Sequence, residues 1–161
     1  MKIVDLAYLA LYGVLKFLVW CLPYKALMVL ARGIACIAYT FNLKHRKIIK
    51  ANLRLCFPQK TEAEIKQITR DTYKNFAKFA FDMLRNQNAT KEDIKNIVSI
   101  DDIYMLQKAF KSKRVIVFIT AHFSCWELIP AIYASYFGAI SVVSRTLDSK
   151  VMNEKLINAR T

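Results

Sequence analysis

The segment from Arg114 to Leu128 restricts the possible fold more than any other part of this chain. It opens with a short run of β-branched and aromatic residues at positions 114–120 and ends in an apolar helix pattern. A continuous apolar run of this length is typical of a buried parallel strand. The segment therefore predicts a strand, a turn and a helix in that order, which is the repeating unit of an α/β fold.

Two residues that can carry chemistry flank the predicted turn. His122 follows the strand, at the sheet edge where open α/β folds bind their ligands, and Glu127 begins the helix. Within one helix, side chains five positions apart diverge by about 140°. A change of chain direction between them lets the two side chains converge. His122 is then a candidate general base, and Glu127 is the carboxylate that fixes its tautomer.

Both residues also have a structural interpretation. Ser124 and Glu127 fit a capping box, in which the serine caps the helix and the glutamate binds the amide of the cap. A single histidine at a strand end is equally compatible with a packing role. Ser124 is not predicted to be a nucleophile, because the Gly-x-Ser-x-Gly pattern is missing. The pattern alone leaves catalytic and structural roles open for His122 and Glu127.

The first 43 residues are dominated by apolar side chains, which Pro23 divides into two segments. Lys16 and Arg32 interrupt these segments. Each of these charges costs about 2.5–3.5 kcal/mol at a bilayer centre, which several leucines at about −0.5 kcal/mol can offset. The pattern predicts membrane-embedded or interfacial helices over residues 1–43, with residues 3–22 forming an embedded helix. Two buried helices of a soluble core are the alternative.

Positive charge follows the apolar region directly. The formal net charge is +13, and five basic residues lie between Lys44 and Arg54. Each can contribute about 1 kcal/mol near an anionic bilayer, and the positive-inside rule places a domain of residues 44–161 on the cytoplasmic face. No nucleic acid partner is predicted, because the chain has no zinc spacing, RNP-like aromatic motif or glycine-rich clamp. Cys36 and His45 lack partners at ligand spacing, so no metal is predicted.

Helix and strand patterns alternate through the rest of the chain. A basic helix ends before Phe57-Pro58, and Thr61 to Glu64 is a capping box that opens a helix to about Arg85. The remaining predicted elements are a strand at 97–100, helices at 101–111 and 126–137, a strand at 139–144 and a helix at 149–159. This alternation predicts right-handed βαβ units, with Arg145 on the same sheet edge as His122.

Three blocks of the sequence resemble one enzyme family. His122-x-x-x-x-Glu127, with Trp126 before the glutamate, looks like the H-x4-D/E motif of glycerolipid-type acyltransferases. Residues 144–148, Ser-Arg-Thr-Leu-Asp, narrow the resemblance to the late acyltransferases of lipid A biosynthesis, the lauroyl/myristoyl transferase family. A further block matches the early part of that family in order and spacing: Arg46, Ala51-Asn52-Leu53 and Phe57-Pro58.

The resemblance implies an acyltransferase of lipopolysaccharide biosynthesis that uses acyl-carrier protein as its donor. It implies that His122 deprotonates a hydroxyl of a lipid A precursor and that Glu127 orients the imidazole and stabilises its charge. Arg145 and Asp148 are the implied substrate-binding residues, with Arg145 binding an anionic group or the oxyanion; a surface ion pair between them is the alternative. The implied partners are acyl-carrier protein, an anionic glycolipid acceptor and the cell inner membrane. No cofactor is implied, because the thioester is already activated.

The expected fold is an α/β, glycerolipid-acyltransferase-like sheet flanked by helices, with N-terminal membrane-associated helices. The chain departs from the family at Ser124-Cys125, where the family has Gly-Asn, and a serine there hinders close approach of a thioester. Family members are longer, so the resemblance predicts that the C-terminal half of the fold is absent and that the 139–144 strand has an unpaired edge. The alternative function is a non-catalytic membrane-surface protein or an inactive truncated fragment of such an enzyme.

Overall fold

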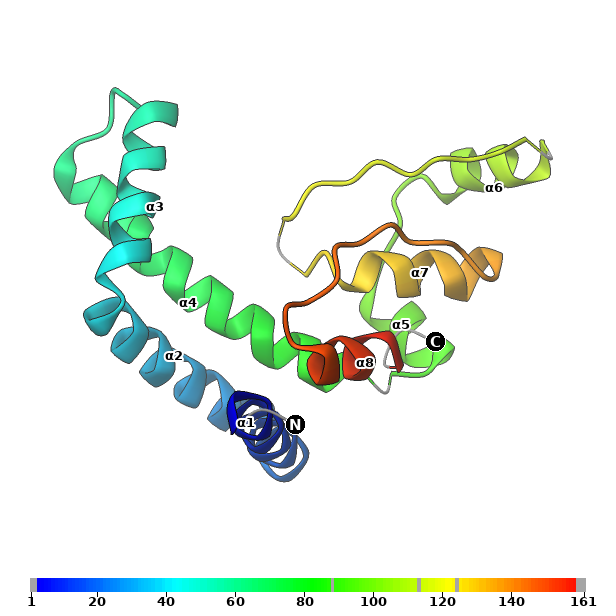
Figure 1. Ribbon diagram of the computed structural model, residues 1–161. Helices are drawn as coiled ribbons and strands as arrows, with labels where there is room; N and C mark the ends of the chain where they lie inside the picture. Colours follow the sequence, from blue (N-terminus) through cyan, green and yellow to red (C-terminus); the bar gives the residue numbers. More distant parts are fainter. Residues whose placement is uncertain (1–2, 88, 113, 124, 159–161) are drawn as a thin grey trace. The chain divides into compact units, whose positions relative to one another are not determined.

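The computed structural model describes residues 3–87, 89–112, 114–123 and 125–158. These residues form eight α-helices and no strand (Figure 1). In chain order the helices are α1 (Ile3–Cys21), α2 (Tyr24–Phe41), α3 (Leu43–Cys56), α4 (Glu62–Asn86), α5 (Lys91–Ile97), α6 (Ile103–Lys111), α7 (Leu128–Phe137) and α8 (Lys150–Asn158).

The two N-terminal helices meet at Pro23, as the sequence predicts. Proline has a fixed φ and no amide hydrogen, so it suits the start of a helix and not its interior. Pro23 is the N-cap of α2, with φ −64° and ψ 151°. Both α1 and α2 are long and apolar enough to cross a membrane, a test that core helices and signal sequences also pass. None of the described residues of α1 is buried, and three residues of α2 are.

The predicted capping box at the start of α4 is confirmed. The Thr61 amide and hydroxyl donate to the Glu64 carboxylate at 2.8 and 2.9 Å, and the Glu64 amide donates to the Thr61 hydroxyl at 3.3 Å. These bonds from Thr61, followed by the one from Lys60, favour the ionised carboxylate and lower the pKa of Glu64 to about 2. The basic helix α3 also ends as predicted, with Phe57 as its C-cap.

The chain divides into two compact units. Residues Gly13–Leu84 form one unit, and the described residues of Met1–Tyr12 and Arg85–Thr161 form the other. The first unit therefore holds about half of α1, all of α2 and α3, and most of α4. The second unit holds α5 to α8 and the segment that contains the candidate catalytic residues.

The core of the first unit lies where α2 packs against α4. Leu27, Ala31 and Ala35 recur every four residues along one face of α2, and each is at most 2% exposed. They pack with Ala77 and Phe81 of α4, which are also four residues apart. Side chains at this spacing share one face of a helix, so two such faces form a continuous contact. The alanines let the two helices approach closely.

The second unit is held together by stacked aromatic rings. The rings of Phe110 and Phe137 lie 4.0 Å apart with an interplanar angle of 5°, and those of Phe118 and Tyr133 lie 4.1 Å apart at 22°. A contact of 5.9 Å between Phe110 and Phe118 joins the two pairs. These rings come from α6, from the segment after it and from α7. They hold the segment that leads to His122 against α7.

The predicted α/β sheet is wrong. Residues 115–123 and 139–147 follow extended paths in Figure 1, but no strand occurs in the described part of the chain. None of its backbone hydrogen bonds outside the helices joins one of these segments to the other. Val115, Val117 and Ile119 are 94%, 77% and 93% exposed, so one side of the first segment contacts nothing. A strand needs a paired neighbour to satisfy its amides and carbonyls, and the described residues supply none to this segment. The segment is held instead by ring contacts of Phe118 with α6 and α7.

The region between α4 and α6 also differs from the prediction. The sequence predicted a strand at 97–100, whereas the structure has α5 at Lys91–Ile97. Thr90 and Asp93 form a reciprocal capping box at its start, with the Thr90 hydroxyl donating to Asp93 at 2.8 Å and accepting from its amide at 3.1 Å. Aspartate at the third helical position replaces the usual glutamate, and this cap fixes the helix start.

Candidate active site

The chain reverses direction at His122. The Phe123 amide donates to the Ala121 carbonyl at 2.9 Å, which makes His122 the central residue of a γ-turn. The exposed His122 ring lies against Trp126, with ring centroids 4.2 Å apart and planes at 48°. The predicted change of direction before α7 is therefore present, although the predicted strand that should precede it is not.

Glu127 lies at the N-cap of α7 instead of in its first turn. Its backbone has φ −64° and ψ −18°, and its side chain makes no capping hydrogen bond. The amides of Leu128 and Ile129 donate to the carbonyls of Cys125 and Trp126 at 2.9 and 3.1 Å, which closes the turn. A carboxylate here is stabilised by the positive end of the helix dipole. Ser124, the other half of the predicted capping box, lies outside the described residues.

His122 and Glu127 are brought to one short turn but are not bonded to each other. Within the described part of the chain, no hydrogen bond or ion pair joins the two side chains, and the contact of His122 is with Trp126. Since Trp126 directly precedes Glu127, that contact keeps the imidazole beside the start of α7. The two predicted catalytic residues are therefore close along the chain, but their side chains do not form a hydrogen-bonded pair among the described residues.

Two aromatic residues that the sequence analysis did not single out position this turn. Phe118, four residues before His122, stacks on Tyr133 of α7, with ring centroids 4.1 Å apart. With the contact between His122 and Trp126, this fixes the segment to the α7 region at two points. The available signal was the concentration of aromatic residues in positions 118–137, which predicts packing but does not pair the rings.

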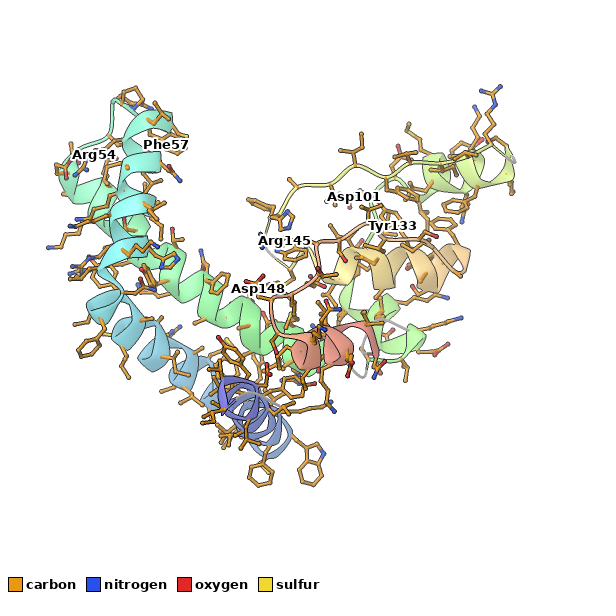
Figure 2. All side chains as sticks on the ribbon, in the orientation of Figure 1. Arg54, Phe57, Asp101, Tyr133, Arg145 and Asp148 are labelled. Carbon is orange, nitrogen blue, oxygen red and sulfur yellow. The ribbon has the colours of Figure 1, made fainter. Side chains whose placement is uncertain are left out.

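Arg145 and Asp148 form an exposed ion pair before α8 (Figure 2). A guanidinium nitrogen of Arg145 lies 3.4 Å from a carboxylate oxygen of Asp148, and their side chains are 88% and 95% exposed. The Leu147 amide donates to Oδ1 of Asn153 at 3.0 Å, which ties the loop to α8. Among the described residues, neither Arg145 nor Asp148 contacts His122. The shared sheet edge predicted for Arg145 is absent together with the sheet.

A hollow in this unit does not involve the candidate site residues. It has a volume of about 570 Å³ and is lined by residues 95–100, Ile103 and Tyr136. His122, Glu127, Arg145 and Asp148 do not line it. Lys95 lies over the Tyr136 ring there, 5.2 Å from its centroid. The described residues contain no group of three or more histidine, cysteine or acidic side chains that could hold a metal ion.

The chain belongs to the bacterial lipid A biosynthesis acyltransferase family, whose model matches residues 2–161. The match spans both units and confirms the resemblance drawn from the three sequence blocks. Members of such a family take an acyl group from a donor and attach it to a lipid acceptor. Neither the comparison with curated proteins nor that with solved structures gave a match.

Proposed function

We propose that this protein transfers a fatty acyl chain from acyl-carrier protein to a hydroxyl of a lipid A precursor, at the cytoplasmic face of the inner membrane. The observation that carries the proposal is the family match over residues 2–161. The net charge of +13 suits both an acidic carrier protein and a phosphorylated glycolipid. The two apolar helices α1 and α2 suit a lipid-embedded acceptor.

His122 is the proposed general base. Its exposed ring accepts the proton of the acceptor hydroxyl, and the hydroxyl oxygen attacks the carbonyl carbon of the acyl thioester. The tetrahedral intermediate collapses with cleavage of the carbon–sulfur bond, and the imidazolium returns the proton to the leaving thiolate. The products are an ester and a thiol, so His122 ends in its starting state.

Glu127 is the proposed partner of the imidazolium. Its carboxylate stabilises the positive charge that His122 carries while the intermediate exists. Because no hydrogen bond joins the two side chains in the structure, the pair closes when substrates bind. Catalytic hydrogen bonds are often long or absent without substrate and tighten in the complex, so this closure is a normal step.

Arg145 and Asp148 are the proposed substrate-binding residues. A fully exposed ion pair contributes little to stability, so a substrate anion can take the place of the Asp148 carboxylate on the guanidinium. Arg145 then binds an anionic group of the acceptor or the developing oxyanion. Asp148 keeps the guanidinium oriented until that exchange.

A non-catalytic membrane-surface protein is the second candidate. What favours it is that the described residues form no sheet and that His122 and Glu127 are not bonded. In that case the His122 contact with Trp126 is packing, and Glu127 has a structural role at the start of α7. The membrane-associated part of the proposal is common to both candidates.

The test is acyl transfer from labelled acyl-carrier protein to a tetra-acylated lipid A precursor in detergent. His122→Ala should lower the rate by about two to four decades, the usual contribution of a positioned general base. His45→Ala is the matched control, because His45 is the other histidine of the chain and lies on the exposed start of α3. No product from the unchanged protein supports the non-catalytic candidate, and equal rates in both variants exclude His122 as the base.

A further inference from the structure

Two tyrosines and two arginines form a cluster at one end of the contact between α2 and α4. Tyr39 continues the buried face of α2 four residues beyond Ala35, and its ring meets that of Tyr73 on α4 edge to face at 5.7 Å. The guanidinium carbons of Arg46 and Arg70 lie 5.0 and 5.5 Å from the Tyr39 ring centroid. Arg46 comes from α3 and Arg70 from α4, so three helices of the first unit contribute to this cluster.

The described residues supply no carboxylate to these two arginines. Arg46 donates to the Tyr39 carbonyl at 3.0 Å, which satisfies one N–H of its guanidinium. Arg70 makes no hydrogen bond or ion pair with the described residues. The acid nearest to it in sequence, Asp71, binds Lys74 and Gln67 at 2.8 and 2.9 Å.

The surrounding sequence strengthens this excess of positive charge. From Leu6 to Thr61 the chain contains no aspartate or glutamate, and α3 carries basic residues on every turn. Two guanidinium groups beside one tyrosine ring repel each other, and attraction to the ring offsets this only in part. A bound anion offsets this positive charge. Guanidinium forks bind phosphate with paired hydrogen bonds, so a phosphate group is the anion that fits.

Exposed apolar side chains lie next to the cluster along the chain. Ile37, Phe41 and Leu43 are 63%, 79% and 54% exposed, at the end of α2 and the start of α3. A ligand that carries both a phosphate and an acyl chain can use both features. We propose that Arg46 and Arg70 bind the phosphate of an anionic phospholipid, whose acyl chains cover the exposed apolar side chains at the α2–α3 turn.

A lipid fits this site better than an acidic protein does. Ile37 and Phe41 lie about 160° round α2 from Tyr39, so a rigid acidic protein bound at the arginines would leave them uncovered, whereas flexible acyl chains can reach round the end of the helix. The cluster also adjoins the end of α2, one of the two helices apolar enough to enter a bilayer. The proposal does not depend on acyl transfer, because none of the candidate catalytic residues belongs to this cluster.

The experiment measures binding of a short-chain phosphatidylglycerol, labelled at the end of its acyl chain, to the purified 161-residue protein in non-ionic detergent. Fluorescence anisotropy gives the Kd without any acyl donor. Arg70→Gln should weaken binding by about tenfold, the usual effect of removing one charge-assisted contact, and adding Arg46→Gln should weaken it further. Arg54→Gln is the control, because it makes the same charge change on α3 but its guanidinium binds Glu62 at 2.8 Å. That control should change the Kd by less than about twofold.

Two further ligands identify what the site recognises. The same probe built on diacylglycerol lacks the phosphate, and its binding should not respond to the arginine variants. Inorganic phosphate and acyl-carrier protein are the competitors, and neither should displace the lipid at equal concentration. Equal losses in Arg54→Gln and Arg70→Gln would reduce the site to general charge attraction. Displacement by inorganic phosphate would refute the lipid assignment, and displacement by the carrier protein would assign the surface to a protein partner.

Arg46 contacts the backbone at the end of α2, so its substitution can also disturb folding. Arg70→Gln alone keeps the test decisive, because the Arg70 side chain is exposed and makes no hydrogen bond with the described residues. Thermal unfolding of each variant provides the check on folding. A fully folded Arg70→Gln protein with unchanged phosphatidylglycerol affinity would overturn the proposal.

Discussion

The imidazole of His122 rests against the indole of Trp126, with the ring centroids 4.2 Å apart. The γ-turn at His122 and the start of α7 after Glu127 bring the two rings together. The contact links the predicted general base to the tryptophan that directly precedes Glu127. It also limits the rotation of the imidazole, which matters because a general base must meet its proton within hydrogen-bond distance.

Trp126 should therefore act as a positioning residue. Trp126→Leu should lower kcat by about 10- to 100-fold, because a loosely held base spends less time in productive geometry. KM should stay nearly constant, and Trp126→Phe should restore part of the rate by keeping an aromatic ring. Trp20→Leu is the control, since Trp20 is the other tryptophan of the chain and is 84% exposed. A rise in KM at constant kcat would instead make Trp126 a substrate contact.

Glu127 can be tested through its charge. Glu127→Gln keeps the size of the side chain and removes the carboxylate that stabilises the imidazolium. The rate of acyl transfer should fall by at least about tenfold, and Glu127→Asp should recover part of it. Circular dichroism checks that α7 still forms. A near-normal rate in a folded Glu127→Gln protein would leave Glu127 with only a structural role at the start of α7.

Most of the helices, though not α5, could be predicted from the sequence because their signals are local. Pro23 separates α1 from α2 through its fixed φ and missing amide hydrogen. Thr61 and Glu64 start α4 through bonds between residues three apart, and Asp102 caps α6 in the same way by accepting from the Met105 amide. Each of these signals involves residues a few positions apart, so the sequence alone is enough to predict where these helices begin.

The sheet could not be predicted in the same way, because pairing is not local. The run from Val115 to Thr120 does adopt an extended path, which its β-branched residues favour. Becoming a strand also requires a second segment to pair with it, and nothing in an apolar pattern shows that such a segment is in place. The contact of Phe118 with Tyr133 is equally non-local, and so is the cluster around Tyr39. The sequence predicts that His122 and Glu127 flank one turn, but whether their side chains meet depends on geometry that spacing does not contain.

The capping box of α4 makes stability depend on pH in the acid range. The folded protein lowers the pKa of Glu64 from 4.5 to about 2, so the unfolded chain takes up a proton first as the pH falls. The contribution of Glu64 is complete above pH 4.5 and is lost between there and pH 2. Glu64→Gln should lower the thermal midpoint at neutral pH, measured by circular dichroism. It should also reduce the fall of that midpoint between pH 4.5 and pH 2, the acid limb of the stability curve. Glu92→Gln in the first turn of α5, where Glu92 makes no hydrogen bond with the described residues, should leave the limb unchanged.

Two phenylalanines of α4 provide a matched test of the α2–α4 core. Phe81 is 4% exposed and packs with Leu27, Ala31 and Ala35, whereas Phe76 is 70% exposed. Phe81→Ala leaves a cavity and should lower the free energy of unfolding by about 3–5 kcal/mol. Phe76→Ala should lower it by less than about 1 kcal/mol. Denaturant unfolding in detergent measures both, and similar losses would mean that α2 and α4 do not form this core in solution.

The last prediction concerns how the protein is held at the membrane. Several large apolar side chains of α1 are exposed, including Phe17 at 62% and Trp20 at 84%, and the basic helix α3 follows α2. Salt at 1 M shortens the screening length to about 3 Å and removes most of the basic contribution, but it leaves apolar insertion intact. The protein should therefore remain with membranes through a high-salt wash. Replacing Lys44, Lys47 and Lys50 by glutamine should not release it, whereas Phe17→Asp with Trp20→Asp should make it extractable by salt. Complete release of the unchanged protein by salt would show that electrostatic contacts alone hold it and would exclude an embedded α1.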